Sequence, residues 1–328
     1  MRAPLARIQQ WYAEGLEALR RGDVAQSLNY WELITKEDGS ESAALQNLVF
    51  CHLKLEHYEE VLRLVPVGLA LDSQNLELRR LRAQAALQKE EFAVAMEDAE
   101  TVLIKDPSDA EMAQVLIFSA IFMSDLTRAE SANKRALKAH PDHPIFQFAA
   151  CKLAFLHGNL NEASRLMLSL LERHAGEPKI QELAADLYLA RGEIAESRRH
   201  LEEVIRLGAA SIKTQNSLGW LEFGAGRYQQ ALQRFSESIL ANEAQTEAYI
   251  GAGYCHFKAN NLAEAQICCN KGIRYSPKDI RNWELLFCIA EARKDRHSAM
   301  RALKEIHQLD PQGLTDSGKK AKAFYQRK

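Results

Sequence analysis

Residues 212–245 read IKTQNSLGWLEFGAGRYQQALQRFSESILANEAQ, and residues 246–279 read TEAYIGAGYCHFKANNLAEAQICCNKGIRYSPKD. Aligned without a gap, the two stretches place Gly219 over Gly253 at the eighth position and Ala231 over Ala265 at the twentieth. Small residues recur in this way where two helices cross too closely for a larger side chain. The two stretches therefore predict consecutive copies of one pair of packed helices.

The same 34-residue period runs through most of the chain without an insertion or a deletion. The twentieth residue is small in eight of the nine repeats, and the seventeenth is apolar in eight of the nine. Self-similarity at a fixed period of this length is typical of a repeat array rather than of separate globular domains. The repeats begin at Ile8, Ser42, Leu76, Ala110, Pro144, Pro178, Ile212, Thr246 and Ile280, and the last one ends at Gly313.

Turn-forming residues divide each repeat into two halves. Gly22-Asp23 and Gly226-Arg227 fall in the middle of repeats, whereas Asp106-Pro107 and Ser276-Pro277 fall near repeat ends. Glycine and proline at such points end one helix and precede the next. Each repeat is therefore predicted to be two helices joined by short turns.

This pattern resembles the tetratricopeptide repeat family, whose period is 34 residues with Trp, Leu-Gly, Ala and Pro among its recurring residues. Trp11 with Gly15, Leu218-Gly219 and Trp283 with Pro311 fit that pattern. The resemblance covers residues 8–313 and implies an all-α, right-handed superhelical solenoid of nine helix-turn-helix repeats. Residues 1–7 then form an N-terminal extension. The basic segment 314–328 is either a short capping helix from about Asp316 or a disordered tail.

Two features depart from the family pattern. Arg79 and Arg82 stand where the family usually has apolar packing residues. Pro66 and Gly68 fall inside the second helix of the second repeat, where proline removes a backbone hydrogen bond and bends the helix axis. A local irregularity is predicted near residues 64–69.

The composition limits the partners and the compartment. The chain carries 42 Lys and Arg against 44 Asp and Glu, so it offers no strong field for nucleic acid or for an anionic membrane. It has no apolar stretch long enough for a signal peptide or for direct membrane insertion, which predicts a cytoplasmic protein. Its cysteines lack zinc or disulfide spacing and are expected to be free thiols. They are Cys51, Cys151, Cys255, Cys268, Cys269 and Cys288.

No motif for catalysis, metal binding or a cofactor stands out. Two imidazoles and a carboxylate gather in residues 140–144, but the prolines there mark a turn between repeats. Gly251-Ala252-Gly253 begins like a dinucleotide-binding loop, but His256 replaces the third glycine and no strand precedes it. The sequence therefore predicts no enzyme, no catalytic residue, no metal and no cofactor.

The resemblance implies that the first helix of each repeat lines a concave groove. The groove-facing positions of the fourth, fifth, seventh and eighth repeats are rich in aromatic residues, which commonly anchor protein partners. The alternative is that these rings pack against neighbouring helices as ordinary core. The candidate partner-binding residues are Phe118, Phe122, Phe148, Lys152, Phe155, Asn216, Trp220, Phe223, Tyr254 and Phe257.

The sixth repeat differs, because Lys179, Glu182 and Asp186 occupy the corresponding positions. They could add a polar stripe to the groove, and a solvated helix face explains them equally well. The resulting hypothesis is a scaffold or adaptor that binds an extended segment or an amphipathic helix of a partner protein. Two alternatives remain open: a cytosolic chaperone for a secreted or membrane-associated client, and a structural protein that self-associates through the same groove.

Overall fold

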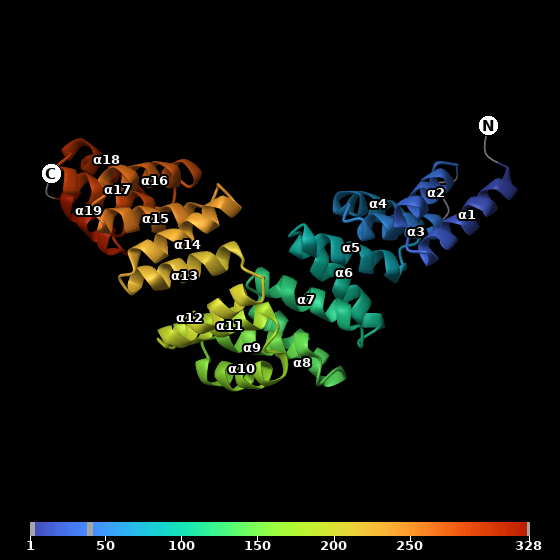
Figure 1. Cartoon of the computed structure of the whole chain (residues 1–328). Helices are drawn as coiled ribbons and strands as arrows, with labels where there is room; N and C mark the ends of the chain where they lie inside the picture. Colours follow the sequence, from blue (N-terminus) through green and yellow to red (C-terminus); the bar gives the residue numbers. More distant parts are fainter. Residues whose placement is uncertain (1–3, 38–41, 327–328) are drawn as a thin grey trace. The chain divides into compact units, whose positions relative to one another are not determined.

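The computed structural model describes residues 4–37 and 42–326, which form nineteen α-helices with no strand among them. The chain divides into two compact parts, an N-terminal part (Met1–Leu170) and a C-terminal part (Leu171–Lys328). Each part is described by itself. Figure 1 shows the helices coloured along the sequence.

The helices of the N-terminal part are α1 (Leu5–Arg20), α2 (Val24–Glu37), α3 (Ser42–Lys54), α4 (Tyr58–Leu71), α5 (Leu76–Gln88), α6 (Phe92–Lys105), α7 (Ala110–Phe122), α8 (Leu126–Ala139) and α9 (Pro144–Leu156). The boundary between the parts falls within α10 (Leu160–His174). The C-terminal part continues with α11 (Pro178–Ala190), α12 (Ile194–Arg206), α13 (Ile212–Gly224), α14 (Tyr228–Ala241), α15 (Thr246–Lys258), α16 (Leu262–Tyr275), α17 (Ile280–Arg293), α18 (Arg296–Leu309) and α19 (Asp316–Gln326).

Odd-numbered helices from α1 to α17 are the first helices of the repeats, and even-numbered helices are the second ones. From α3 at Ser42 to α17 at Ile280, each first helix begins at the residue where the sequence register begins a repeat. The turn inside a repeat contains a residue with positive φ, for example Gly22, Gly158 and Gly226. Glycine adopts this left-handed conformation at no steric cost, which ends the first helix cleanly.

First helices of successive repeats contact one another within each part. In the N-terminal part α3 contacts α5, α5 contacts α7 and α7 contacts α9, while in the C-terminal part α13 contacts α15 and α15 contacts α17. Over the described ranges, successive second helices make no contact of similar extent. The first helices are therefore the more closely spaced row within each part, and we call the face that they share the inner face.

The ring of Phe235 shows why small residues recur at these crossings. Phe235 lies on α14 and is fully buried between α13 and α15. A Cβ atom added at Gly219 would lie 2.7 Å from Phe235 Cε1, and one added at Gly251 would lie 2.2 Å from Phe235 Cζ. The same arrangement recurs in the first repeat, where a Cβ at Gly15 would lie 2.9 Å from Trp31 Cζ2. The glycines therefore provide the space that the buried rings occupy.

The helix α4 runs through Pro66 and Gly68, the two residues for which a local irregularity near residues 64–69 is predicted, and its helical hydrogen bonding continues to Leu71. Pro66 is exposed, so the carbonyl group that loses its N–H partner lies on the solvent side of the helix. Gly68 is buried, and a Cβ there would lie 2.5 Å from Leu78 Cδ1. Gly68 therefore permits close packing of α4 on α5.

The two unusual arginines of α5 neutralise a buried carboxylate. Asp98 on α6 is fully buried, and its carboxylate oxygens lie 3.0 Å from Arg79 Nη1 and 2.5 Å from Arg82 Nε. The hydrogen bond to Asp98 raises the pKa of Arg82. A buried carboxylate stays ionised only when it is paired and hydrogen-bonded. This explains why Arg79 and Arg82 occupy positions where the family usually has apolar residues.

The last helix, α19, begins at Asp316 and packs on the end of the ninth repeat through the buried Ala321. Asp310 forms the turn before it, because its Oδ1 accepts from the N–H of Leu314 at 2.9 Å and its Oδ2 from the N–H of Thr315 at 2.8 Å. These backbone hydrogen bonds lower the pKa of Asp310 to about 2. The segment thus covers the apolar face of the final repeat, as a cap must.

The helix crossings can be tested with two glycines. Gly251→Ala should lower the free energy of unfolding by about 1–3 kcal/mol, because the new methyl group overlaps the ring of Phe235. Gly224→Ala, also in a helix but with nothing within 4 Å of the added Cβ, should leave stability unchanged or raise it by up to about 1 kcal/mol. Urea denaturation followed by circular dichroism measures both. Equal effects of the two substitutions would contradict the packing argument.

The turn at Asp310 predicts a pH dependence. Because the pKa of Asp310 is lowered in the folded state, the stabilisation it provides is complete above its ordinary pKa of about 4 and is lost as the pH falls toward about 2. At neutral pH, Asp310→Ala should speed amide hydrogen exchange in residues 314–326. The control Lys319→Ala, which removes the same exposed pair with Asp316 but keeps the acid in the first turn of α19, should not do so. Unchanged exchange in the Asp310 variant would show that the turn does not hold α19.

Candidate functional site

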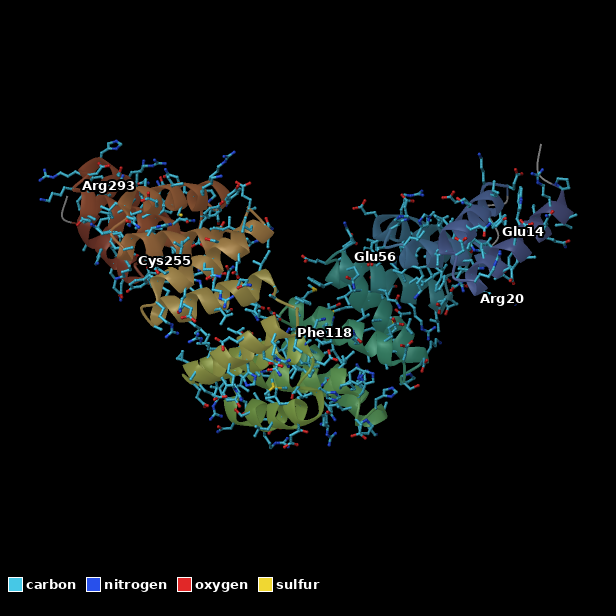
Figure 2. The ribbon with its side chains drawn as sticks, in the orientation of Figure 1. Glu14, Arg20, Glu56, Phe118, Cys255 and Arg293 are labelled. Carbon is cyan, nitrogen blue, oxygen red and sulfur yellow. The ribbon has the colours of Figure 1, made fainter. Side chains whose placement is uncertain are left out.

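Phenylalanine rings gather on the inner face of α7 and α9. Phe118, marked on α7 in Figure 2, lies with its ring centroid 6.4 Å from that of Phe148 on α9, and both rings are half-buried. Phe122 is 60% exposed, yet it stacks on Phe92 of α6 at 4.9 Å with an interplanar angle of 8°. Lys152 Nζ lies 5.7 Å from the centroid of the Phe122 ring. Phe122 is therefore an exposed ring with a fixed orientation.

Two further apolar residues extend this surface. Met123 follows the last residue of α7 and is 49% exposed, and Leu156 ends α9 and is 43% exposed. Phe155 beside Leu156 is half-buried. Because α7 and α9 are neighbouring first helices of the same direction, their final turns lie together. We call Phe122, Met123 and Leu156 the apolar patch. Exposed apolar surface of this kind is typical of protein-binding sites.

The aromatic residues of α13 and α15 form a second group in the C-terminal part. The Trp220 ring lies 5.7 Å from Phe223 and 5.2 Å from the buried Phe235, and Phe223 lies 6.2 Å from Tyr254. All three outer rings are half-buried, and burial raises the pKa of Tyr254. These rings both cover the core and present an edge on the inner face.

The predicted site residues thus divide by part and by exposure. Phe118, Phe122, Phe148, Lys152 and Phe155 lie together in the N-terminal part, and Trp220, Phe223, Tyr254 and Phe257 lie on α13 and α15. Phe257 is half-buried and packs against the core of the last repeats.

Asn216 is a correction to the predicted groove, because it is only 5% exposed. It occupies the fifth position of its repeat. In the second, third and sixth repeats the side chain at this position bonds to the residue that caps the next first helix, and so it points toward the following repeat rather than toward the groove. Asn216 therefore does not line a partner-binding surface.

Polar side chains connect successive repeats at a constant separation of 29 residues. Each link joins the fifth residue of a first helix to the residue that caps the next first helix. The pairs are Gln46 with Asn75 at 3.1 Å, Arg80 with Asp109 at 2.7 Å and Glu182 with Ser211 at 3.0 Å. The same capping side chains accept from backbone N–H groups of Leu78, Met112 and Thr214.

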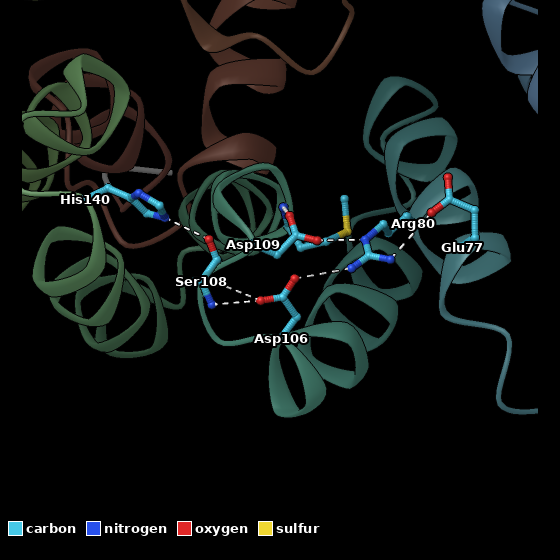
Figure 3. A network of polar contacts seen from close by, with 7 residues as sticks. Glu77, Arg80, Asp106, Ser108, Asp109 and His140 are labelled. Atoms are coloured by element: carbon cyan, nitrogen blue, oxygen red, sulfur yellow. Dashed lines mark hydrogen bonds and ion pairs between the residues drawn. The ribbon is translucent and has the colours of Figure 1, made fainter.

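Figure 3 shows the link made by Arg80, which reaches Asp109, Asp106 and Glu77. Beside it, the imidazole of His140 hydrogen-bonds to the carbonyl oxygen of Ser108 at 2.7 Å. These links are not among the features predicted from the sequence, although complementary polar residues 29 positions apart are a usable signal for them.

The polar residues of the sixth repeat also contact the next repeat. Glu182 accepts from Ser211, and the Asp186 carboxylate lies 2.7 Å from Lys213 Nζ. In the seventh repeat Trp220 Nε1 donates to Glu247 Oε1 at 3.1 Å, and Glu247 lies 3.9 Å from Arg281. The inner face of α11, α13, α15 and α17 is therefore mixed, with aromatic edges beside paired charges.

The thiols are ordinary packing residues. Burial raises the pKa of Cys151, Cys255 and Cys269 to about 12, which keeps them protonated at neutral pH. Cys255 lies within α15 (Figure 2). Within residues 4–37 and 42–326, no three His, Cys, Asp or Glu side chains are grouped as a metal site would require. No helix in the described part of the chain has the length and apolarity needed to cross a bilayer.

Two segments, residues 123–187 and 222–286, match the family model described as Tetratricopeptide repeat. No match is found among the curated proteins. The matched segments fall in both parts of the chain and contain candidate residues of each aromatic group.

Several solved structures have a similar fold. A tetratricopeptide repeat protein from Parabacteroides merdae matches with a TM-score of 0.65 and 17% identity, over 76% of this chain and 98% of that one. The anaphase-promoting complex hetero-tetramer Cut9–Hcn1 matches with a TM-score of 0.64 and 15% identity, over 90% and 59% of the two chains. PilF of Pseudomonas aeruginosa matches with a TM-score of 0.58 and 14% identity, over 67% and 97%. At these identities the similarity shows the fold.

The burial of the thiols predicts their reactivity. In the native protein at pH 8, iodoacetamide should modify the half-buried Cys268 and Cys288 well before Cys151, Cys255 and Cys269, because the buried thiols form little thiolate. In denaturant all should react at similar rates. Peptide mass spectrometry gives the order, and rapid native labelling of Cys255 would contradict its burial in the core cluster around Phe235.

Proposed function

This chain belongs to the tetratricopeptide repeat family, and we propose that it is a protein-interaction scaffold that binds a partner polypeptide on the inner, first-helix face. The observation that carries the proposal is the apolar patch on α7 and α9. Three large apolar residues are 43–60% exposed there, next to half-buried phenylalanines. In water such a surface gains free energy when a partner covers it.

The chemistry of the patch indicates the chemistry of the partner segment. Phe122 is held by stacking on Phe92, so its binding conformation costs little side-chain entropy. Flat rings and flexible methionine at the ends of two helices fit leucine-like or aromatic side chains spaced along an amphipathic helix or an extended segment. The mechanism is binding alone, with no chemical step.

The inner face of the C-terminal part carries both aromatic and charged residues. It suits a second set of contacts with the partner, whose specificity differs from that of the apolar patch. Trp220 offers a ring edge, while its indole N–H is already bonded to Glu247. The paired charges Asp186 and Lys213 can exchange partners with a polar segment at small net cost, because exposed ion pairs contribute little. We propose that the N-terminal part supplies apolar anchoring and that this face supplies polar discrimination.

The thiols bear on the proposed compartment. The cysteines are unpaired. Free thiols favour a reducing environment, and we propose a cytoplasmic location on that basis.

The proposal predicts a difference between two exposed apolar residues. Phe122→Ser on the first helix α7 should abolish capture of the partner, whereas Ile104→Ser on the second helix α6 should not, although Ile104 is 76% exposed and Phe122 60%. Immobilised wild type and both variants would be compared on the same cell extract by quantitative mass spectrometry. Thermal melting should show that both variants remain folded.

The result also separates a scaffold from a protein that associates with itself. Proteins bound by the wild type and by Ile104→Ser, but lost from Phe122→Ser, would support the inner face as the binding surface. Equal losses from both variants, or from neither, would place binding elsewhere and overturn the proposal. If the purified wild-type protein sediments faster at higher concentration, whereas Phe122→Ser does not, the partner is instead a second copy of the chain.

A further inference from the structure

An open hollow of about 420 Å³ lies among α16, α17 and α18, and its lining includes none of the aromatic residues of the inner face. Arginines from all three helices line it, Arg274 from α16, Arg293 from α17 and Arg301 from α18. Gln266 and Asn270 add side-chain amides. The lining is therefore polar and rich in hydrogen-bond donors.

Two of the three guanidinium groups are held in position by the fold. Arg301 lies over the Trp283 ring at 5.5 Å, and the Trp283 indole N–H donates to the carbonyl oxygen of Pro277 at 2.7 Å. Arg293, marked in Figure 2, donates from Nη2 to the carbonyl oxygen of Leu262 at 2.7 Å. A guanidinium has five N–H donors, so one such bond leaves the others available. The donors are thus partly organised before any ligand binds.

The positive charge at the hollow is not neutralised from within. None of the three arginines forms an ion pair with a carboxylate among the residues that the structure describes. The one carboxylate of the lining, Asp295, caps α18 by accepting from the N–H groups of His297 and Ser298. Residues 262–328 carry 14 Lys and Arg against 8 Asp and Glu, although the whole chain carries 42 against 44. The hollow therefore lies in the basic end of a nearly neutral chain.

We propose that this hollow is an oxyanion site that takes a phosphate group. Arginine binds phosphate through paired N–H donors, and clusters of arginine are the usual means of recognising phosphorylated segments. Arg293 is held at the start of α16 and Arg274 projects from its end, so the hollow offers guanidinium donors along its length, and their excess over the single capping carboxylate favours a dianion. The phosphate is either free or carried by a polypeptide, and the two sources share this chemistry. The site is independent of the apolar patch and of the function proposed for it.

The test uses the full chain and isothermal titration calorimetry at constant ionic strength set with chloride. Inorganic phosphate is one probe, and a glycine-flanked phosphoserine peptide with its unphosphorylated twin is the other. Arg274→Gln removes a lining charge without breaking an intramolecular bond, and Arg301→Gln removes a positioned one. Arg296→Gln, on α18 but outside the lining, is the matched control for general electrostatics.

We expect Arg274→Gln and Arg301→Gln each to weaken phosphate binding roughly tenfold or more, since a hydrogen bond to a charged group contributes about that factor. Arg296→Gln should change it less than about twofold. Tighter binding of the phosphopeptide than of inorganic phosphate supports the site with a polypeptide source, and equal binding supports it with a free one. No heat with either phosphate probe, or equal weakening by all three substitutions, overturns the proposal. Circular dichroism confirms folding, and Arg274→Gln keeps the test valid if the loss of the Arg301–Trp283 contact unfolds the last repeat.

Discussion

The close approach of neighbouring helices at glycine and alanine is the constraint on which the array depends. Phe235 fills the space between α13 and α15 only because Gly219 and Gly251 lack a side chain on the two facing surfaces. Ala231 and Ala265, both fully buried, have the same role where the two helices of one repeat cross. Small residues at these crossings let the first helices contact one another from repeat to repeat, which makes their shared face the inner one. The location of the candidate binding surface thus follows from where the helices are allowed to come close.

A second set of contacts, between polar side chains of successive repeats, determines which surface residues remain available to a partner. Each link joins the fifth residue of one first helix to the capping residue of the next first helix. These side chains would otherwise face outward. Each link satisfies a helix end and connects two repeats at once, so it contributes to local and to array stability. The exposed apolar patch lies at the final turns of α7 and α9, away from these links at the beginnings of the first helices.

Periodic features of this structure follow from the sequence, whereas features that depend on a single local contact do not. The repeat register and the starts of the first helices from α3 onward could be predicted, because the 34-residue period places equivalent residues in equivalent surroundings. The burial of Asn216 and the pairing of Arg79 and Arg82 with Asp98 could not be predicted, because each depends on one neighbour from another helix. For the same reason Phe118 and Phe122, four residues apart on α7, differ in exposure. The hollow lined by arginines joins three helices and has no counterpart in a single repeat.

The two faces of the repeats therefore offer different chemistry from one simple architecture. On the inner face, aromatic residues that must cover the core can also expose an edge, so stability and recognition draw on the same side chains, as at Trp220 against Phe235. On the side of α16 and α18, the core is already covered by Trp283 and Leu286, and charged residues can accumulate without loss of packing. Substitutions on the inner face are thus constrained by the packing of these rings. Around the arginine hollow the constraint falls on Arg301 and Arg293, because they contact the Trp283 ring and the Leu262 carbonyl oxygen.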